Sequence, residues 1–121
     1  MPKVDYNYRS NLERYVGALL KRRKQKFEYE VDVLHYVQPA KKRKYTPDFK
    51  LGDKYYIETK GKFTAEDRQK MLLVKEQNPD VRIVLLFGKA HNKLNRKSPT
   101  TYAMWCEKHG FEWLDLREWE K

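Results

Sequence analysis

The first stretch of the chain places hydrophobic residues at helical spacing. Leu12, Val16 and Leu20 recur every four residues, and Ser10 precedes them in the position of an N-cap. The segment from Ser10 to about Gln25 is therefore predicted to form a helix with one apolar face.

The hydrophobic period then changes to two. Four apolar residues alternate with acidic ones between Phe27 and Val33, which predicts a long strand over Phe27–Val37. Gln38-Pro39-Ala40 and the basic run Lys41–Lys44 interrupt the pattern, and a proline there suits a sheet edge or a connection. The chain is expected to leave the strand at this point.

Two shorter strands, Tyr45–Leu51 and Tyr55–Lys60, flank Gly52-Asp53-Lys54 and predict a hairpin. With this loop, the register places Phe49 opposite Ile57, and it places Asp48 opposite Glu58. The same register pairs Lys50 with Tyr56 and Leu51 with Tyr55. Lys60 lies two residues beyond Glu58, so both side chains point to one face of the sheet.

Caps and buried runs predict the remaining elements. In order, they are a helix opened by the capping box Thr64-Ala65-Glu66-Asp67 and ended by Pro79, a buried strand over Val81–Phe87, a helix from Ser98-Pro99 to His109 with Gly110 as C-cap, and a short strand over Phe111–Leu114. The order α-β-β-β-α-β-α-β predicts an α/β domain, with helices that cover a mixed central sheet.

Composition narrows the class of protein. A chain of 121 residues has room for one domain, and 40% hydrophobic residues argue against wholesale disorder. Cys106 is the single cysteine, which excludes an intramolecular disulfide and a multi-cysteine zinc site. The chain has no apolar run near the roughly 20 residues of a membrane span, and Met-Pro-Lys-Val-Asp does not resemble a secretory signal. The expected location is the cytoplasm.

The net charge of +10 points to a nucleic-acid partner. Three basic segments are the candidate DNA contacts, and they comprise Lys21, Arg22, Arg23 and Lys24; Lys41, Lys42, Arg43 and Lys44; and Lys89, Lys93, Arg96 and Lys97. Such segments provide affinity for phosphate without sequence specificity. The alternative is that they are a solvated helix end and two solvated loops.

Asp48, Glu58 and Lys60 are the candidate catalytic group. Like charges opposite each other destabilise a sheet, and a hard divalent cation such as Mg²⁺ or Mn²⁺ compensates two carboxylates. Such a cation activates water for phosphodiester hydrolysis, and Lys60 is placed to hold that water or to stabilise the transition state. The alternative is an exposed salt-bridge ladder on an ordinary hairpin.

Other polar residues have two interpretations. Glu13 fits a capping box with Ser10, yet it also borders the apolar helix face, from which its carboxylate could reach a site beside the sheet. Asp67 and Arg68 fit a helix cap and its salt-bridge partner, or neighbours of the catalytic group. His35, His91 and His109 share no ligand-like spacing, so a histidine metal site is not predicted.

Asp48, Glu58 and Lys60 fit the PD-(D/E)XK nuclease pattern, and the order of elements is similar to its restriction-endonuclease-like αβββαβ core. More narrowly, the chain resembles the phage endonuclease I family of T7-like phages. The segments that carry the resemblance are Ser10–Glu13, Phe27–Glu30, Tyr36–Ala40, Tyr45–Phe49, Glu58–Gly61, Asp67-Arg68, Ser98–Thr100 and Cys106–Gly110.

The resemblance implies a metal-dependent endonuclease that resolves four-way (Holliday) junctions and other branched DNA by paired nicks. It implies two Mg²⁺ ions per active site, with Mn²⁺ as a substitute. Asp48 and Glu58 would bind one ion with the Thr59 carbonyl, Asp48 and Glu13 would bind the second, and Lys60 would be the catalytic lysine.

The resemblance also implies an intertwined, domain-swapped homodimer in which Glu13 completes the active site of the other subunit. The single nuclease domain, residues 1–121, would then comprise an N-terminal helix and strand (10–37), a bridge near 37–44 and a catalytic core (45–121). The basic segments at both ends are shorter than the family pattern, which should weaken phosphate contacts rather than chemistry.

Two other functions remain open from the sequence. One is a PD-(D/E)XK nickase or repair endonuclease without junction preference. The other is a basic DNA-binding protein that performs no chemistry.

Overall fold

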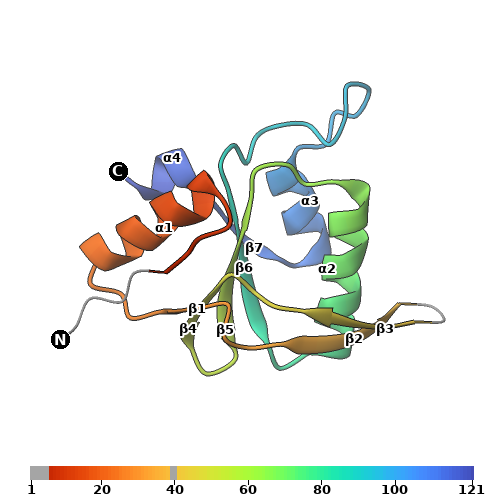
Figure 1. Cartoon of the computed structure of the whole chain (residues 1–121). Helices are drawn as coiled ribbons and strands as arrows, with labels where there is room; N and C mark the ends of the chain where they lie inside the picture. The colour runs from red at the N-terminus through yellow and green to blue at the C-terminus, as the bar shows by residue number, and fades with distance from the viewer. Residues whose placement is uncertain (1–5, 39–40) are drawn as a thin grey trace.

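A sheet of five strands lies at the centre of the molecule, between two layers of helices (Figure 1). The computed structural model describes residues 6–38 and 41–121. The elements are α1 (Asn11–Arg22), β1 (Glu28–Tyr29), β2 (Leu34–Gln38), β3 (Lys41–Tyr45), β4 (Phe49–Gly52), β5 (Tyr55–Lys60), α2 (Ala65–Gln77), β6 (Arg82–Phe87), α3 (Tyr102–His109), β7 (Glu112–Asp115) and α4 (Leu116–Trp119).

The central sheet is mixed, as predicted. Its strand order is β1-β4-β5-β6-β7, with antiparallel pairs from β1 to β5 and parallel pairs from β5 to β7. Each parallel pair needs a crossover connection, and α2 and α3 lie in these two connections. The predicted mixed α/β class is therefore confirmed.

Each face of the sheet buries a separate apolar cluster. On the side of α2 and α3, Phe63, Phe87 and Trp105 belong to the larger cluster. On the side of α1, Val16 and Leu20 join a cluster with strand residues of the opposite sheet face. Successive strand residues point to opposite faces, so the continuously apolar β6 contributes to both clusters.

The first helix is confirmed with a shorter C-terminus. The side chain of Ser10 accepts a hydrogen bond from the Glu13 N–H at 3.1 Å, which is the predicted N-cap. The helix ends at Arg22, three residues before the predicted end, and Lys24 follows with a φ of 56°.

The predicted long strand over Phe27–Val37 is wrong. Glu30 adopts a φ of 49°, a left-handed conformation that a regular strand does not contain. The chain leaves the central sheet there, and β2 belongs to a separate two-stranded sheet. The alternating pattern continues across this change of direction, so hydrophobicity alone did not reveal it.

The basic run was also predicted incorrectly, because it forms β3 rather than a connection. β3 pairs antiparallel with β2 over five residues, in register from Leu34↔Tyr45 to Gln38↔Lys41. Lys41–Lys44 are all exposed, so water solvates their charges while the backbone pairs. The predicted strand over Tyr45–Leu51 is divided, since Tyr45 ends β3 and Phe49 begins β4. The expectations for Pro39-Ala40 and for the first five residues lie outside the described residues.

A side chain of α2 attaches this small sheet to the body of the protein. The Gln77 side-chain carbonyl accepts from the Val37 N–H at 2.5 Å, and its amide N–H donates to the Val37 carbonyl at 2.7 Å. The Asn78 side chain adds a bond to the His35 carbonyl at 3.2 Å. Gln77 thus forms hydrogen bonds with the Val37 N–H and carbonyl on the edge of β2 that does not pair with β3.

The hairpin of β4 and β5 has the predicted register at two of three strand pairs. Phe49 pairs with Ile57 and Lys50 with Tyr56, but a bulge at Leu51 leaves Tyr55 opposite Gly52. The second helix has the predicted capping box of Thr64 and Asp67, and it ends at Gln77, before Pro79.

The C-terminal elements differ from prediction at two points. α3 begins at Tyr102 with Thr101 as N-cap, three residues after the predicted start, and Gly110 ends it in the predicted left-handed conformation with a φ of 76°. The short helix α4, capped by Asp115, was not predicted. Over residues 6–38 and 41–121, no helix has the length and apolar character needed to cross a membrane.

Replacing Gln77 by Ala should loosen the two-stranded sheet without unfolding the core. The substitution removes both hydrogen bonds to Val37, whereas the apolar clusters stay intact. We expect hydrogen exchange at the Val37 amide to accelerate by about tenfold or more, with a loss of global stability of about 1 kcal/mol. Gln69→Ala, an exposed position on the same helix, is the control, and equal exchange in both variants would contradict the role given to Gln77.

Candidate active site

Four carboxylates converge on one open cavity of about 380 Å³, at the end of the sheet where α1 begins and β4 starts. They are Glu13, Glu30, Asp48 and Glu58. Arg9, Lys44 and Lys70 also line the cavity and surround the acidic group with positive charge. The arrangement suits an anionic substrate that approaches an acidic floor through a basic rim.

Asp48 lies in a bend just before β4 and is 8% exposed. Its Oδ2 accepts two hydrogen bonds from Thr59, from the N–H at 2.9 Å and from the hydroxyl at 2.8 Å. Burial raises the pKa of Asp48 to about 6, while the Thr59 hydrogen bonds oppose this shift and the nearby Glu13 adds to it. The geometry fixes the carboxylate on the edge of β5.

Glu58 stands in the middle of β5 and is 6% exposed. Its Oε1 accepts the Asp48 N–H at 3.1 Å, which joins the two predicted site residues through a backbone group. Burial raises the pKa of Glu58 to about 8, the charge of Asp48 adds to the increase, and Lys60 opposes it. Such perturbation is typical of functional carboxylates. The alternative interpretation, an exposed salt-bridge ladder, does not describe these buried groups.

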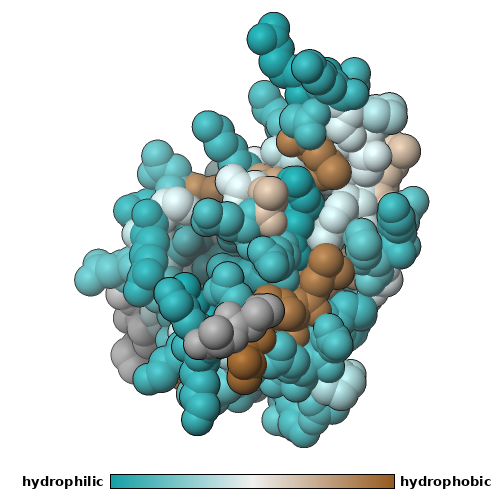
Figure 2. Space-filling view, turned by 90° about the vertical axis from the view of Figure 1, so that its right-hand side faces the viewer, coloured by the Kyte–Doolittle hydropathy of each residue, from teal (hydrophilic) through white to brown (hydrophobic). Residues whose placement is uncertain are grey.

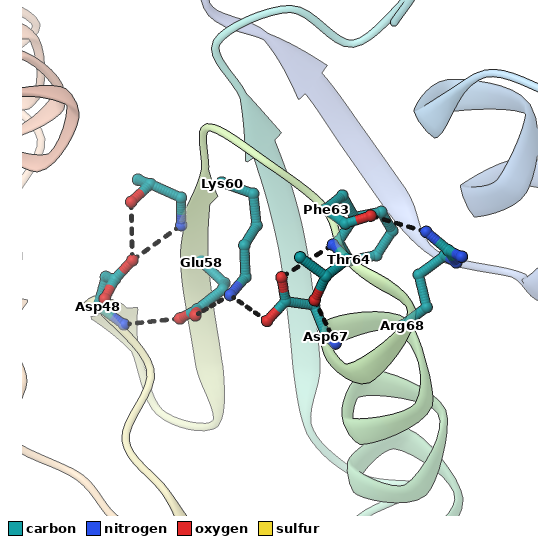
Figure 3. A network of polar contacts seen from close by, with 8 residues as sticks. Asp48, Glu58, Lys60, Phe63, Thr64, Asp67 and Arg68 are labelled. Atoms are coloured by element: carbon teal, nitrogen blue, oxygen red, sulfur yellow. Dashed lines mark hydrogen bonds and ion pairs between the residues drawn. The ribbon is translucent and has the colours of Figure 1, made fainter. Parts of the chain in front are cut away.

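Lys60 connects the carboxylates to α2 (Figure 3). Its Nζ lies 3.7 Å from Glu58 Oε2 and 3.1 Å from Asp67 Oδ1. Burial of Asp67 favours a higher pKa, but its hydrogen bonds with Thr64 and its contacts with Lys60 together hold the pKa below the usual range. Asp67 is therefore both the helix cap and a neighbour of the candidate catalytic group, and the adjacent Arg68 donates to the Phe63 carbonyl at 2.7 Å.

Glu13 reaches the cavity from α1. Its backbone N–H serves the N-cap, whereas its carboxylate accepts hydrogen bonds from the Tyr29 hydroxyl and from the Arg9 N–H. Burial raises the pKa of Tyr29 above its ordinary value, and the hydrogen bond to Glu13 adds to the increase, so the phenol remains a donor. The predicted capping box is therefore found only in its Ser10 half, and the Glu13 carboxylate faces the cavity, where Arg9 and Tyr29 are its donors.

Three of the carboxylates are close enough to share an ion. Carboxylate oxygens of Glu13, Glu30 and Asp48 lie within 4.8 Å of one another, and Glu58 adjoins the group through its bond with the Asp48 N–H. An oxygen-only donor set of this kind fits Mg²⁺ or Mn²⁺. Tyr45 lines the same cavity, and its buried hydroxyl lies beside the Glu58 carboxylate without a hydrogen bond of ordinary geometry to the described residues.

Glu30 was missed by sequence reasoning. The alternating pattern placed it on the polar face of a long strand, and its left-handed backbone was not visible in that pattern. Arg9 and Lys70 were missed as well, because both are single cations outside the basic clusters. The role of the Thr59 carbonyl stays a prediction.

The predicted DNA contacts lie at different distances from the cavity. Lys44 lines it directly, and the other three cations of β3, Lys41, Lys42 and Arg43, are exposed. The basic residues Lys21–Lys24 are at the C-terminal end of α1, away from Glu13, and the Arg23 guanidinium lies 4.8 Å from the centre of the Trp119 ring. The basic residues between Lys89 and Lys97 are on the exposed loop between β6 and α3, which projects from the body of the protein (Figure 1).

A histidine and two carboxylates meet outside the cavity, although their sequence spacing did not suggest it. His91, Asp115 and Glu118 bring ligand-type atoms within 4.8 Å of one another. The Asp115 carboxylate already accepts the N–H groups of Ala90, Arg117 and Glu118, which explains its position as a helix cap and loop anchor.

Comparison with known proteins identifies relatives over nearly the whole chain. Residues 2–117 match the sequence model of the family described as phage endonuclease I. The chain is 44% identical to Endodeoxyribonuclease 1 of Enterobacteria phage T3 over 108 residues, which cover 89% of this chain and 71% of the relative. It is 43% identical to Endonuclease I of Escherichia phage T7 over 117 residues, which cover 94% of this chain and 78% of the relative.

The buried carboxylates should make the metal-free protein less stable at high pH. Folded Glu58 and Asp48 retain protons up to about pH 8 and pH 6, whereas the unfolded chain releases them near pH 4, so the free energy of unfolding falls as pH rises between these values. Urea denaturation in EDTA at pH 5 and pH 8 measures this decrease.

In the Glu58→Gln variant, the decrease between pH 5 and pH 8 should be smaller by about 1–3 kcal/mol, because the amide does not ionise. Glu76→Gln, at an exposed position of α2, should retain the wild-type decrease. The same pH dependence in all three proteins would show that Glu58 is not destabilised by ionisation.

Proposed function

The chain belongs to the phage endonuclease I family of DNA endonucleases, and we propose that it resolves four-way DNA junctions by metal-dependent phosphodiester hydrolysis. The observation that carries this proposal is the group of buried carboxylates beside Lys60, in a protein with a net charge of +10. An acidic floor that can hold cations and a basic surround that attracts DNA are the two requirements of such a nuclease.

The proposed cofactor is Mg²⁺, two ions per active site, with Mn²⁺ as a substitute. Asp48 and Glu58 would hold one ion with the Thr59 carbonyl, and Asp48 and Glu13 would hold the other. The oxygen donors and the burial of these residues support the assignment. A bound divalent cation lowers the pKa of coordinated water and neutralises charge on the scissile phosphate.

Lys60 is the proposed catalytic lysine. An ammonium group has three N–H donors, and Glu58 and Asp67 account for two contacts of Lys60. The remaining donor would hold the attacking water or a phosphate oxygen. Asp67, fixed by the cap of α2, keeps the amine in place while the substrate binds.

The proposed substrate is branched DNA recognised by shape. The three exposed basic segments offer phosphate contacts in separate directions, and such contacts respond to the path of the backbone rather than to base identity. A two-fold dimer would match the symmetry of a four-way junction, with one nick from each active site.

We further propose that the dimer is domain-swapped through the β2–β3 hairpin. If the connection between these strands opened, β2 and β3 of one chain would exchange the same five residue pairs with a second chain. The sequence between them is Pro39-Ala40, whereas two-residue hairpin loops favour residues that tolerate positive φ, such as Asn-Gly. The N-terminal segment with Glu13 would then complete the site of the partner.

The surface beside this hairpin also supports an interface. Val31, Val33 and Val37 are about half exposed, at 50%, 47% and 50%. Figure 2 shows apolar side chains at the surface of the face that carries the hairpin and α2. Association would remove such residues from water.

Cleavage of an immobile four-way junction tests the function. With Mg²⁺, we expect symmetric paired nicks near the branch point and little cutting of the linear duplex arms, and EDTA should abolish cleavage. Asp48→Asn should reduce the rate by about 1,000-fold while junction binding is retained. Asp53→Asn, at an exposed turn residue, is the matched control.

Each of the other outcomes contradicts a different part of the proposed function. Tight junction binding without nicks would favour a non-catalytic binding protein. Equal cutting of plain duplex would support the nuclease activity and contradict the junction preference. Full activity in EDTA would contradict the metal dependence.

Mixed dimers test the shared active site. Glu13→Ala and Lys60→Ala chains should each be inactive alone. In a swapped heterodimer, one site receives both defects and the other none, so coexpression should restore up to about one quarter of wild-type nicking. A different affinity tag on each chain allows purification of the mixed dimers and confirms that they form. If these dimers recover no nicking activity, the active site is not shared between subunits.

A further inference from the structure

Glu30 occupies an unusual position beside the cavity. It follows β1 with a φ of 49°, and its N–H donates to the Asp48 carbonyl at 2.9 Å. This bond joins the backbones of the two residues where the chain leaves the central sheet. The result is that Glu30 faces the cavity together with Asp48, although 18 residues separate them in the sequence.

Positive side chains line the cavity, but few of them form direct ion pairs with the carboxylates around Glu30. Glu13, Glu30 and Asp48 bring three carboxylates within 4.8 Å, whereas Lys60 pairs with Glu58 and Asp67 instead. The ion pair that reaches the group joins Arg9 Nε to Glu30 Oε1 at 3.2 Å. The Arg9 side chain is 78% exposed, so this pair is weak and readily exchanged.

A separate observation indicates that the cavity receives a polar occupant. The Tyr45 hydroxyl is buried in the cavity wall beside the Glu58 carboxylate, and it makes no hydrogen bond of ordinary geometry with the described residues. A buried hydroxyl without a partner is unfavourable unless water or a ligand satisfies it. A hydrated cation, or a phosphate oxygen beside it, is an occupant of the required chemistry.

We propose that Glu30 is a third carboxylate ligand of the cation held by Glu13 and Asp48, and that Arg9 neutralises Glu30 when this cation is absent. The inference rests on the proposed metal dependence and adds a ligand to it. Glu30 thereby gives the site a donor from the β1 end, independent of Glu58. Arg9 competes with the cation and returns to solvent when the cation binds.

Binding of Mn²⁺ to the full-length protein without DNA tests the proposal, with electron paramagnetic resonance to measure free Mn²⁺. The wild type should bind two ions per chain. Glu30→Gln should bind one of them at least about tenfold more weakly and the other within about twofold of wild type. Glutamine fits the backbone conformation as glutamate does, so thermal stability in EDTA should be unchanged or higher.

Two further variants separate ligation from general charge. Glu66→Gln removes an exposed carboxylate of α2 that lines a second pocket, which shares Lys44 and Lys70 with the cavity, and both Mn²⁺ affinities should stay within about twofold of wild type. Arg9→Gln removes the guanidinium that competes with the cation. In this single variant, the Mn²⁺ site that contains Glu30 should bind the ion about two- to fivefold more tightly than in the wild type. Equal effects of Glu30→Gln and Glu66→Gln would overturn the ligand role.

The result also distinguishes this proposal from the function on which it rests. Weaker Mn²⁺ binding in Asp48→Asn, with wild-type binding in Glu30→Gln, would overturn the role of Glu30 and leave the nuclease mechanism intact. No Mn²⁺ binding to the wild type, or unchanged binding in Asp48→Asn, would overturn both. If Glu30→Gln failed to fold, Glu30→Asp would replace it, and Mn²⁺ binding equal to wild type in that folded variant would count against the proposal.

Discussion

Repulsion between buried carboxylates is the constraint on which the site depends. Asp48 and Glu58 are almost fully buried, the Asp48 N–H donates to the Glu58 carboxylate, and the pKa values of the two side chains are raised to about 6 and 8. An isolated charge of this kind would be expelled or neutralised, because desolvation disfavours the ionised form. The fold counters the cost with donors from its own framework: Thr59 for Asp48, the Asp48 N–H for Glu58, and Tyr29 for Glu13. The remaining imbalance is what the proposed cations would neutralise.

The same framework explains why the acidic group is so compact. Asp48 and Glu58 belong to one hairpin, so their approach is set by local pairing of β4 and β5. Glu13 and Glu30 come from the N-terminal segment and reach the same cavity through α1 and β1. Lys60 is anchored from the other side by α2. The N-terminal segment and the hairpin thus both supply carboxylates to one cavity, and α2 holds Lys60 of the hairpin through Asp67.

Much of this arrangement could be predicted from sequence, where the information was local. The Asp48–Glu58–Lys60 group follows from a short hairpin with an obvious turn, and the caps at Ser10, Thr64 and Gly110 follow from single residue types. The long strand over Phe27–Val37 failed because one backbone angle at Glu30 redirects the chain without disturbing the alternating pattern. The basic run was missed as a strand because four consecutive exposed cations show no alternation of apolar and polar residues, and because Gln77, which holds the neighbouring β2, is distant in sequence. Glu30 escaped notice because the alternating pattern does not show its left-handed backbone.

The short pairing between β1 and β4 has a consequence for the order in which the protein folds. β1 joins the central sheet through two residue pairs, Glu28↔Lys50 and Tyr29↔Phe49, while β4 to β7 and their helices form a nearly continuous segment of the chain. Short-range contacts form faster than distant ones, so the segment from β4 onward should assemble before the N-terminal segment joins it. Cation binding that needs Glu13 would then arise only at the last step of maturation. A newly made chain would pass through its folding intermediates without the ability to damage DNA.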